Sequence, residues 1–343
     1  MRGRLLVALA LVLGLSGCGW MDGSYVSVTP HQVGVGQVGE DSGQSVSSYA
    51  QLRTALIQMV DEGSAKGLFT LVEYPLEAAM EDMERAVEYV TRTYPIGAYA
   101  VESVSHAFGT NAISVDITYR HSPQEIESIR TVRGVDGTRK AVADALDDCA
   151  EKLVLQISGY RDMDLTAMVQ DYGWRNPDRI METPSVTFRI CPDRGETRVV
   201  ELLFFYRTDR EELRSMRQEV EPVFDSAALF VSGQSSDRTK FSELQTFLTE
   251  RFDYQVEYMV TPAYSLLCRG IGDSRAFSQV YAAMCQRIGL EAKTVSGTRN
   301  GEKHWWNQIL LDGEWYHLDL TASDTFEPRT EAEMTGYEWN RES

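Results

Sequence analysis

The chain has 343 residues, of which 43% are hydrophobic, so it can bury cores in two or three domains and is not disordered. Its formal net charge of -18 at pH 7 disfavours binding to nucleic acid, because the phosphates would be repelled by an acidic surface. The cysteines and histidines lack the spacing of metal ligands, and we expect neither a metal nor a cofactor.

The first residues predict export and a lipid anchor. Two arginines precede an apolar run, Leu5 to Leu15, that is too short to span a bilayer. The sequence Leu15-Ser16-Gly17-Cys18 resembles a bacterial lipobox, which implies that residues 1–17 are a signal peptide and that Cys18 is diacylated. The acyl chains would hold the protein on the extracytoplasmic face of the cell membrane. The alternative is an ordinary secretory signal in which the cysteine is incidental.

Residues 18–47 are rich in glycine, serine, valine and glutamine without a period, which predicts a flexible tether. An α+β unit is expected over residues 48–134, and it opens at Ser47-Ser48, where a helix start precedes an apolar stripe. The expected elements are a helix ending at Gly63, a strand over 68–72, a helix over 76–91, strands over 99–107 and 112–119, and a helix from Pro123.

The same order of elements recurs over residues 135–222, which predicts an internal repeat. Single residues correspond as well, since Tyr74 matches Tyr160 and Tyr119-Arg120 matches Tyr206-Arg207. Two copies are too few for a solenoid, so we expect a pair of small modules with a structural or binding role. The expected elements are helices over 138–151, 163–172 and 208–219 and strands over 153–157, 185–190 and 198–206.

The last region, residues 223–343, combines helices with antiparallel strands. A helix is expected from about Asp237 and continues through residues 264–267, and a further helix opens after Gly272-Asp273-Ser274 and ends at Gly289. Strands follow over 293–296 and 304–311, and the Asp312-Gly313 turn predicts a hairpin with a strand over 315–320.

Three motifs in this region are similar to those of the transglutaminase-like (papain-like thiol) superfamily. They are Val295-Ser296-Gly297, His304-Trp305-Trp306-Asn307 and the run from Trp315 to Thr321, and residues 334–340 resemble the tail of such bacterial domains. The resemblance implies an α+β chain in which a papain-like fold follows the two modules. It also implies that His304 shuttles a proton and that Asp319 orients it, with Tyr264, Trp305 and Asn307 as candidate substrate-binding residues.

The chain departs from the family at the nucleophile. Counting from both flanking motifs, Ser274 stands where the family has its cysteine, and Ala276 and Phe277 replace the usual glycine and tyrosine. A serine hydroxyl titrates far above accessible pH, so it would need His304 as a base, whereas a thiol near a helix N-terminus ionises readily. A site shaped around sulfur also misplaces the shorter side chain, and about 1 Å can cost on the order of 10²-fold in rate.

Two functions follow from this exchange. The first is a membrane-anchored protein whose inactive transglutaminase-like domain binds a peptide, protein or cell-wall ligand. The alternative is a serine-dependent hydrolase or amidase of peptide-like substrates that uses Ser274, His304 and Asp319 as a triad.

The cysteines beyond Cys18 leave their pairing open. Cys149 and Cys285 lie on apolar helix faces and are expected to be buried, while Cys268, six residues before Ser274, is a less favoured substitute nucleophile.

Overall fold

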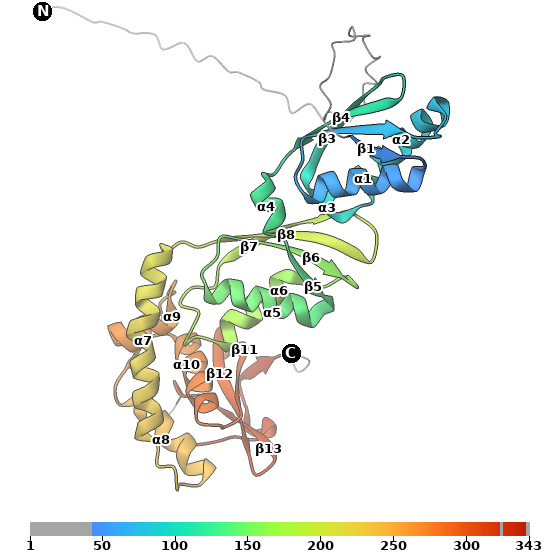
Figure 1. Cartoon of the computed structure of the whole chain (residues 1–343). Coiled ribbons are helices and arrows are strands. Elements are labelled where there is room, and N and C mark those ends of the chain that lie inside the picture. Colours follow the sequence, from blue (N-terminus) through green and yellow to red (C-terminus); the bar gives the residue numbers. More distant parts are fainter. Residues whose placement is uncertain (1–42, 323–324, 341–343) are drawn as a thin grey trace, which may run out of the picture. The chain divides into compact units, whose positions relative to one another are not determined.

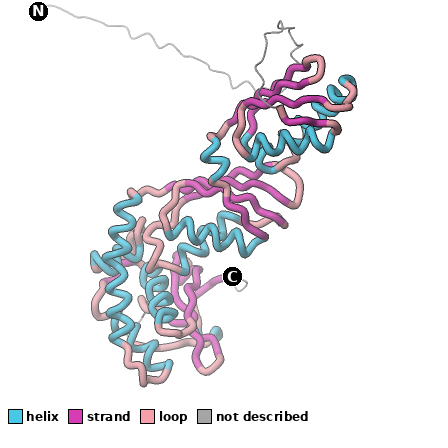
Figure 2. Tube along the Cα trace, viewed as in Figure 1, coloured by secondary structure: helices cyan, strands magenta, loops and turns pink. Residues whose placement is uncertain are grey.

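Helices and strands alternate along the chain, which has the expected α+β composition (Figure 2). The computed structural model describes residues 43–322 and 325–340. The expected signal peptide, the lipidation of Cys18 and nearly all of the tether lie outside the described residues. Within those ranges, no helix is both long enough and apolar enough to cross a membrane.

The N-terminal module, residues 44–127, is a four-stranded sheet with helices on one face (Figure 1). The sheet has the order β1-β2-β4-β3, with β1 parallel to β2 and the other pairs antiparallel. The predicted helix start is confirmed, because the Ser48 hydroxyl accepts a hydrogen bond from the Gln51 N–H as an N-cap. The elements are β1 (Gln44–Val46), α1 (Tyr49–Asp61), β2 (Lys66–Leu71), α2 (Leu76–Arg92), α3 (Pro95–Ala100), β3 (Val101–Phe108), β4 (Ala112–Tyr119) and α4 (Pro123–Glu127).

The middle module, residues 130–205, has a sheet of the same kind, in the order β5-β6-β8-β7 with β5 parallel to β6. Helices α5 and α6 pack on one face of it (Figure 1). The repeat of the sequence stays a prediction, because a shared topology does not require a duplicated sequence. The elements are β5 (Arg130–Arg133), α5 (Gly134–Asp147), β6 (Lys152–Ser158), α6 (Leu165–Arg175), β7 (Ser185–Cys191) and β8 (Thr197–Phe205).

The strand predicted from residue 99 was wrong at its start. Residues Pro95–Ala100 form the short helix α3, and β3 begins only at Val101. Proline at the first helical position fixes a helical φ and loses no hydrogen bond there, which favours a helix start over a strand. Tyr99 is buried as a result, and its hydroxyl donates to Glu201 on β8.

The C-terminal region, residues 210–340, places four helices around a second kind of sheet. Helix α7 crosses the boundary expected between residues 222 and 223, and its apolar face joins the core of this region. The expected continuation through residues 264–267 is instead a separate helix, α9, which begins with Pro262. The helices are α7 (Arg210–Phe230), α8 (Asp237–Thr249), α9 (Pro262–Arg269) and α10 (Ser274–Arg287).

The sheet of the C-terminal region has the order β13-β12-β11-β14, and all its pairs are antiparallel. The predicted hairpin is confirmed, since Asp312 and Gly313 have φ values of 52° and 84°, as a tight turn between β12 and β13 requires. The strands of the sheet are β11 (Ala292–Arg299), β12 (Glu302–Leu311), β13 (Glu314–Leu318) and β14 (Tyr337–Trp339), and the 3-10 helix η1 (Glu331–Glu333) precedes β14. Two further strands, β9 (Asp253–Tyr254) and β10 (Ile271–Gly272), form a separate parallel pair.

Gly297 on β11 is required by the close approach of β14. A Cβ atom at this position would lie 2.1 Å from the Glu338 carbonyl oxygen and 2.8 Å from the Trp306 ring. We expect Gly297→Ala to lower the free energy of unfolding by about 1–3 kcal/mol, because backbone must move to relieve the clash. Urea unfolding measures this loss.

The matched control is Gly109→Ala, whose added Cβ would meet its nearest atom at an ordinary 3.5 Å. This variant should change the free energy of unfolding by no more than about 0.5 kcal/mol. Equal unfolding midpoints for the two variants would contradict the close packing of β14 on β11.

Candidate functional site

Ser274 is the first residue of α10 and is held there by its neighbours. The Asp273 carboxylate caps the helix by accepting from the Ala276 N–H at 2.8 Å. Gly272 precedes the cap, and a Cβ there would lie 2.9 Å from the Leu266 side chain and 3.0 Å from the Ala276 Cβ. Ser274 is 5% exposed, so its hydroxyl is fixed inside the site by the packing of α10.

The Ser274 hydroxyl points toward β12. Its Oγ accepts a hydrogen bond from the Trp305 backbone N–H at 3.4 Å. In the part of the chain that the structure describes, no hydrogen bond joins this oxygen to the His304 ring. The fold therefore places Ser274 against β12, but its hydroxyl lacks the hydrogen bond through which His304 would take its proton.

His304 and Asp319 form a buried pair. The His304 Nε2 atom lies 2.7 Å from Asp319 Oδ2, and both side chains are almost completely buried. The Tyr337 hydroxyl on β14 donates to the same oxygen at 2.7 Å, and Thr321 donates to Oδ1 through its N–H and its hydroxyl. Arg299 adds a positive charge 3.6 Å from Oδ2.

The charge of Asp319 survives burial because of these partners. Burial alone would raise the pKa of Asp319, but the hydrogen bonds from His304, Tyr337 and Thr321 outweigh it and hold the pKa below its usual value. A carboxylate in this state can orient His304 and stabilise its protonated ring.

The aromatic side chains behind His304 fix the plane of its ring. Trp306 is fully buried, and its ring stacks near His304 at a centroid distance of 6.4 Å. The Trp306 indole N–H donates to His317 Nδ1 at 2.8 Å, and the Gln308 carboxamide lies 3.1 Å from His317 Nε2. His317 thus packs behind the site, between Trp306 and Gln308.

A pocket of about 320 Å³ opens beside the His304–Asp319 pair. Thr321 lines the pocket, and its hydroxyl lies 3.4 Å from His304 Nε2. Two further lining residues, Tyr254 and Phe277, pack edge to face with their ring centroids 6.5 Å apart. Burial and the charge of Asp319 raise the pKa of Tyr254. The lining residues are Thr249, Phe252, Asp253, Tyr254, Phe277, Leu320, Thr321 and Ala322.

Tyr254, Arg299 and Tyr337 are site residues that sequence reasoning missed. The alternation of Tyr254, Val256 and Tyr258 was an available signal in the sequence, and the structure exposes all three side chains. Arg299 lies at the end of β11, and Tyr337 reaches Asp319 because β14 pairs with β11, a pairing that no local sequence pattern predicts.

The predicted substrate-binding residues lie in different surroundings. Trp305 contacts Ser274 through its backbone, and the Lys303 ammonium lies 4.9 Å from the centre of its ring. Asn307 is fully buried, and its amide donates to the Ser278 carbonyl of α10 at 2.8 Å, so it ties the helix to β12. The Tyr264 hydroxyl donates to Glu219 on α7.

The cysteines among the described residues are free thiols, which answers the question of their pairing for that part of the chain. Cys285 is buried as expected, and Cys149 is partly buried. Cys268 is exposed on α9. Across residues 43–322 and 325–340, no group of three or more metal-binding side chains is placed to hold an ion.

A comparison with known protein families found a match in the C-terminal region. Residues 225–320 match the transglutaminase-like superfamily, so the chain contains a transglutaminase-like domain. No curated protein matches the chain.

Three solved structures are similar to the chain. A structure described as a TGase is 13% identical with a TM-score of 0.29, and the match covers 53% of this chain but only 54% of that one. A candidate cysteine protease from Cytophaga hutchinsonii is 13% identical, with a TM-score of 0.27 and coverage of 45% and 73%. A candidate protease from Parabacteroides distasonis is 10% identical, with a TM-score of 0.26 and coverage of 51% and 41%.

His317 should make the stability of the protein fall in acid. Burial lowers the pKa of His317 from its ordinary 6.5, so its contribution to stability is complete above pH 6.5 and is lost as the pH falls through the folded-state pKa. Urea unfolding at a series of pH values should give a shallower pH dependence for His317→Gln than for the unmodified protein. The pKa of His121 is also lowered, but His121 is present in both proteins. Identical slopes would show that His317 does not carry the effect.

Proposed function

We propose that the chain is a lipid-anchored protein on the extracytoplasmic face of the membrane, whose transglutaminase-like domain binds a peptide, protein or cell-wall ligand without turning it over. The lipobox-like sequence ending at Cys18 supports the anchor. The match of residues 225–320 supports the domain, and the exchange at position 274 supports the loss of turnover.

The observation that carries this proposal is the hydrogen bonding of the Ser274 hydroxyl. Its oxygen accepts from the Trp305 N–H, and it lacks a hydrogen bond to His304 within the described structure. An alcohol needs a base during attack, because its own ionisation is out of reach at neutral pH. The arrangement favours holding a ligand over attacking it.

The pocket beside Thr321 is where such a ligand would be held. Its walls combine the rings of Phe252, Tyr254 and Phe277 with the hydroxyls of Thr249 and Thr321. Apolar walls with a few placed polar groups are typical of sites that bind peptide side chains. The 45% exposure of Tyr254 leaves its ring free for a partner.

The serine-dependent hydrolase remains the second candidate, because the His304–Asp319 pair is intact. The distance of 2.7 Å and the three further donors to Asp319 are what a general base with an orienting carboxylate requires. Catalytic hydrogen bonds also tighten when substrate binds, so a ligand that moved Ser274 toward His304 would complete a triad.

A cysteine at position 274 should be reactive toward alkylating agents. In a Cys268→Ser background, which removes the exposed native thiol, we expect Ser274→Cys to be alkylated by iodoacetamide at neutral pH, because the α10 N-terminus and His304 lower the pKa of the new thiol. Mass spectrometry measures the alkylation rate. Adding His304→Ala should slow it and shift its pH profile upward.

The unmodified protein and the Ser274→Ala variant distinguish the binding proposal from the serine-dependent hydrolase. With activated esters and a peptide library, the unmodified protein should show no turnover above the Ser274→Ala variant. Turnover by the unmodified protein that Ser274→Ala abolishes would sink the binding proposal and establish the serine hydrolase.

Peptide binding should depend on Tyr254. On a peptide array, we expect Tyr254→Ala to weaken binding on the order of tenfold, because it removes one aromatic wall of the pocket. The control is Phe205→Ala, which removes an exposed aromatic side chain on β8 that does not line the pocket. Equal loss in both variants, or no binding by the unmodified protein, would contradict a peptide site at this pocket.

A further inference from the structure

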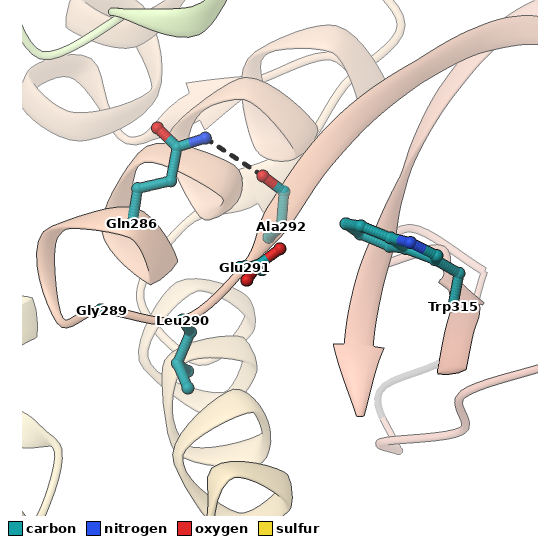
Figure 3. Close-up of a pocket in the computed structure, with 6 residues that line it drawn as sticks. All are labelled: Gln286, Gly289, Leu290, Glu291, Ala292 and Trp315. Atoms are coloured by element: carbon teal, nitrogen blue, oxygen red, sulfur yellow. Dashed lines mark hydrogen bonds between the residues drawn. The ribbon is translucent and has the colours of Figure 1, made fainter. Parts of the chain in front are cut away.

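A second pocket lies at the other end of α10. It has a volume of about 380 Å³ and is lined by Gln286, Gly289, Leu290, Glu291, Ala292 and Trp315 (Figure 3). Because Ser274 begins α10 and Gln286 lies in its last turn, the helix separates the two sites by roughly 18 Å at 1.5 Å per residue. This pocket therefore plays no part in the chemistry around Ser274.

Trp315 forms one wall of the pocket and is held by the sheet. It pairs with Leu310 on β12, and the Leu310 N–H donates to the Glu291 carbonyl, so these three residues lie side by side across the sheet. The Trp315 side chain is 42% exposed, a large indole surface left to solvent. The Lys293 ammonium lies 4.7 Å from the ring centre. The indole is thus a fixed platform rather than a mobile side chain.

The opposite wall carries hydrogen-bonding groups. In Figure 3 the Glu291 side chain and the Trp315 indole stand on opposite sides of the pocket. In the described structure the Glu291 carboxylate has neither an ion-pair nor a hydrogen-bond partner. The Gln286 carboxamide is fixed, because it donates to the Ala292 carbonyl at 3.1 Å. The pocket thus combines an exposed indole with a solvent-exposed carboxylate that has no protein partner in the described structure.

This chemistry excludes several ligand classes. A purely apolar ligand would bury the Glu291 carboxylate without a partner, which is costly. A nucleotide or another anion would be repelled by Glu291, and a cation on the indole would be repelled by the Lys293 ammonium 4.7 Å from the ring centre. Lys293 itself does not line the pocket, so a neutral ligand can still contact the indole there. A sugar ring satisfies every group, since its flat face presents C–H bonds to an indole and its edge presents hydroxyl donors to a carboxylate.

We propose that the pocket between Glu291 and Trp315 binds a pyranose ring of a neutral glycan. The sugar would lie against the Trp315 indole, with ring hydroxyls donating to Glu291. The pocket is at the small end of the range for ligand sites, which suits one or two sugar rings. The domain would then hold a glycan at one end of α10, independently of any ligand near Ser274.

Calorimetric titration with soluble trisaccharides of glucose, galactose and N-acetylglucosamine tests the proposal on the ectodomain. We expect at least one to bind at millimolar concentration, Trp315→Ala to weaken binding on the order of tenfold or more, and Trp315→Phe to retain most of it. Glu291→Gln should weaken binding less, since an amide oxygen still accepts.

Two controls keep the result specific. Phe205→Ala removes an aromatic side chain of comparable exposure, 52%, on β8 and should leave glycan binding unchanged. Ser274→Ala should also leave it unchanged, so a failure of the proposed function near Ser274 is separable from a failure here. Binding of none of the three sugars, or binding that Trp315→Ala does not alter, would overturn the glycan site.

Discussion

The burial of α10 is the constraint on which the C-terminal region depends. All residues from Ala276 to Cys285 are buried, between the sheet on one side and α8 and α9 on the other. Apolar packing on every side leaves the helix no freedom to slide or turn. Its first residue, Ser274, is thereby fixed against β12, and its last turn forms one wall of the pocket that contains Trp315.

This rigidity gives weight to the identity of the side chain at position 274. The scaffold still orients His304 through Asp319, and Asn307 still ties β12 to α10. A hydroxyl at position 274 is a weaker acid than a thiol, and the packing of α10 holds it against β12 rather than in hydrogen-bond contact with His304.

Elements with a strong local pattern could be predicted from the sequence. The three-and-four spacing in α10 and the Asp312-Gly313 turn depend on neighbours in the chain, and both are confirmed. Helix α3 was missed because six residues give too short a period to distinguish a helix from a strand. Two partners of Asp319, Arg299 and Tyr337, could not be foreseen, because they reach it through sheet pairing between distant segments.

The pairing of β14 with β11 also links the charge of Asp319 to the formation of the sheet edge. Until β14 pairs with β11, Asp319 lacks the Tyr337 donor, and burying its carboxylate costs more. The edge strand and the buried carboxylate therefore form cooperatively during folding.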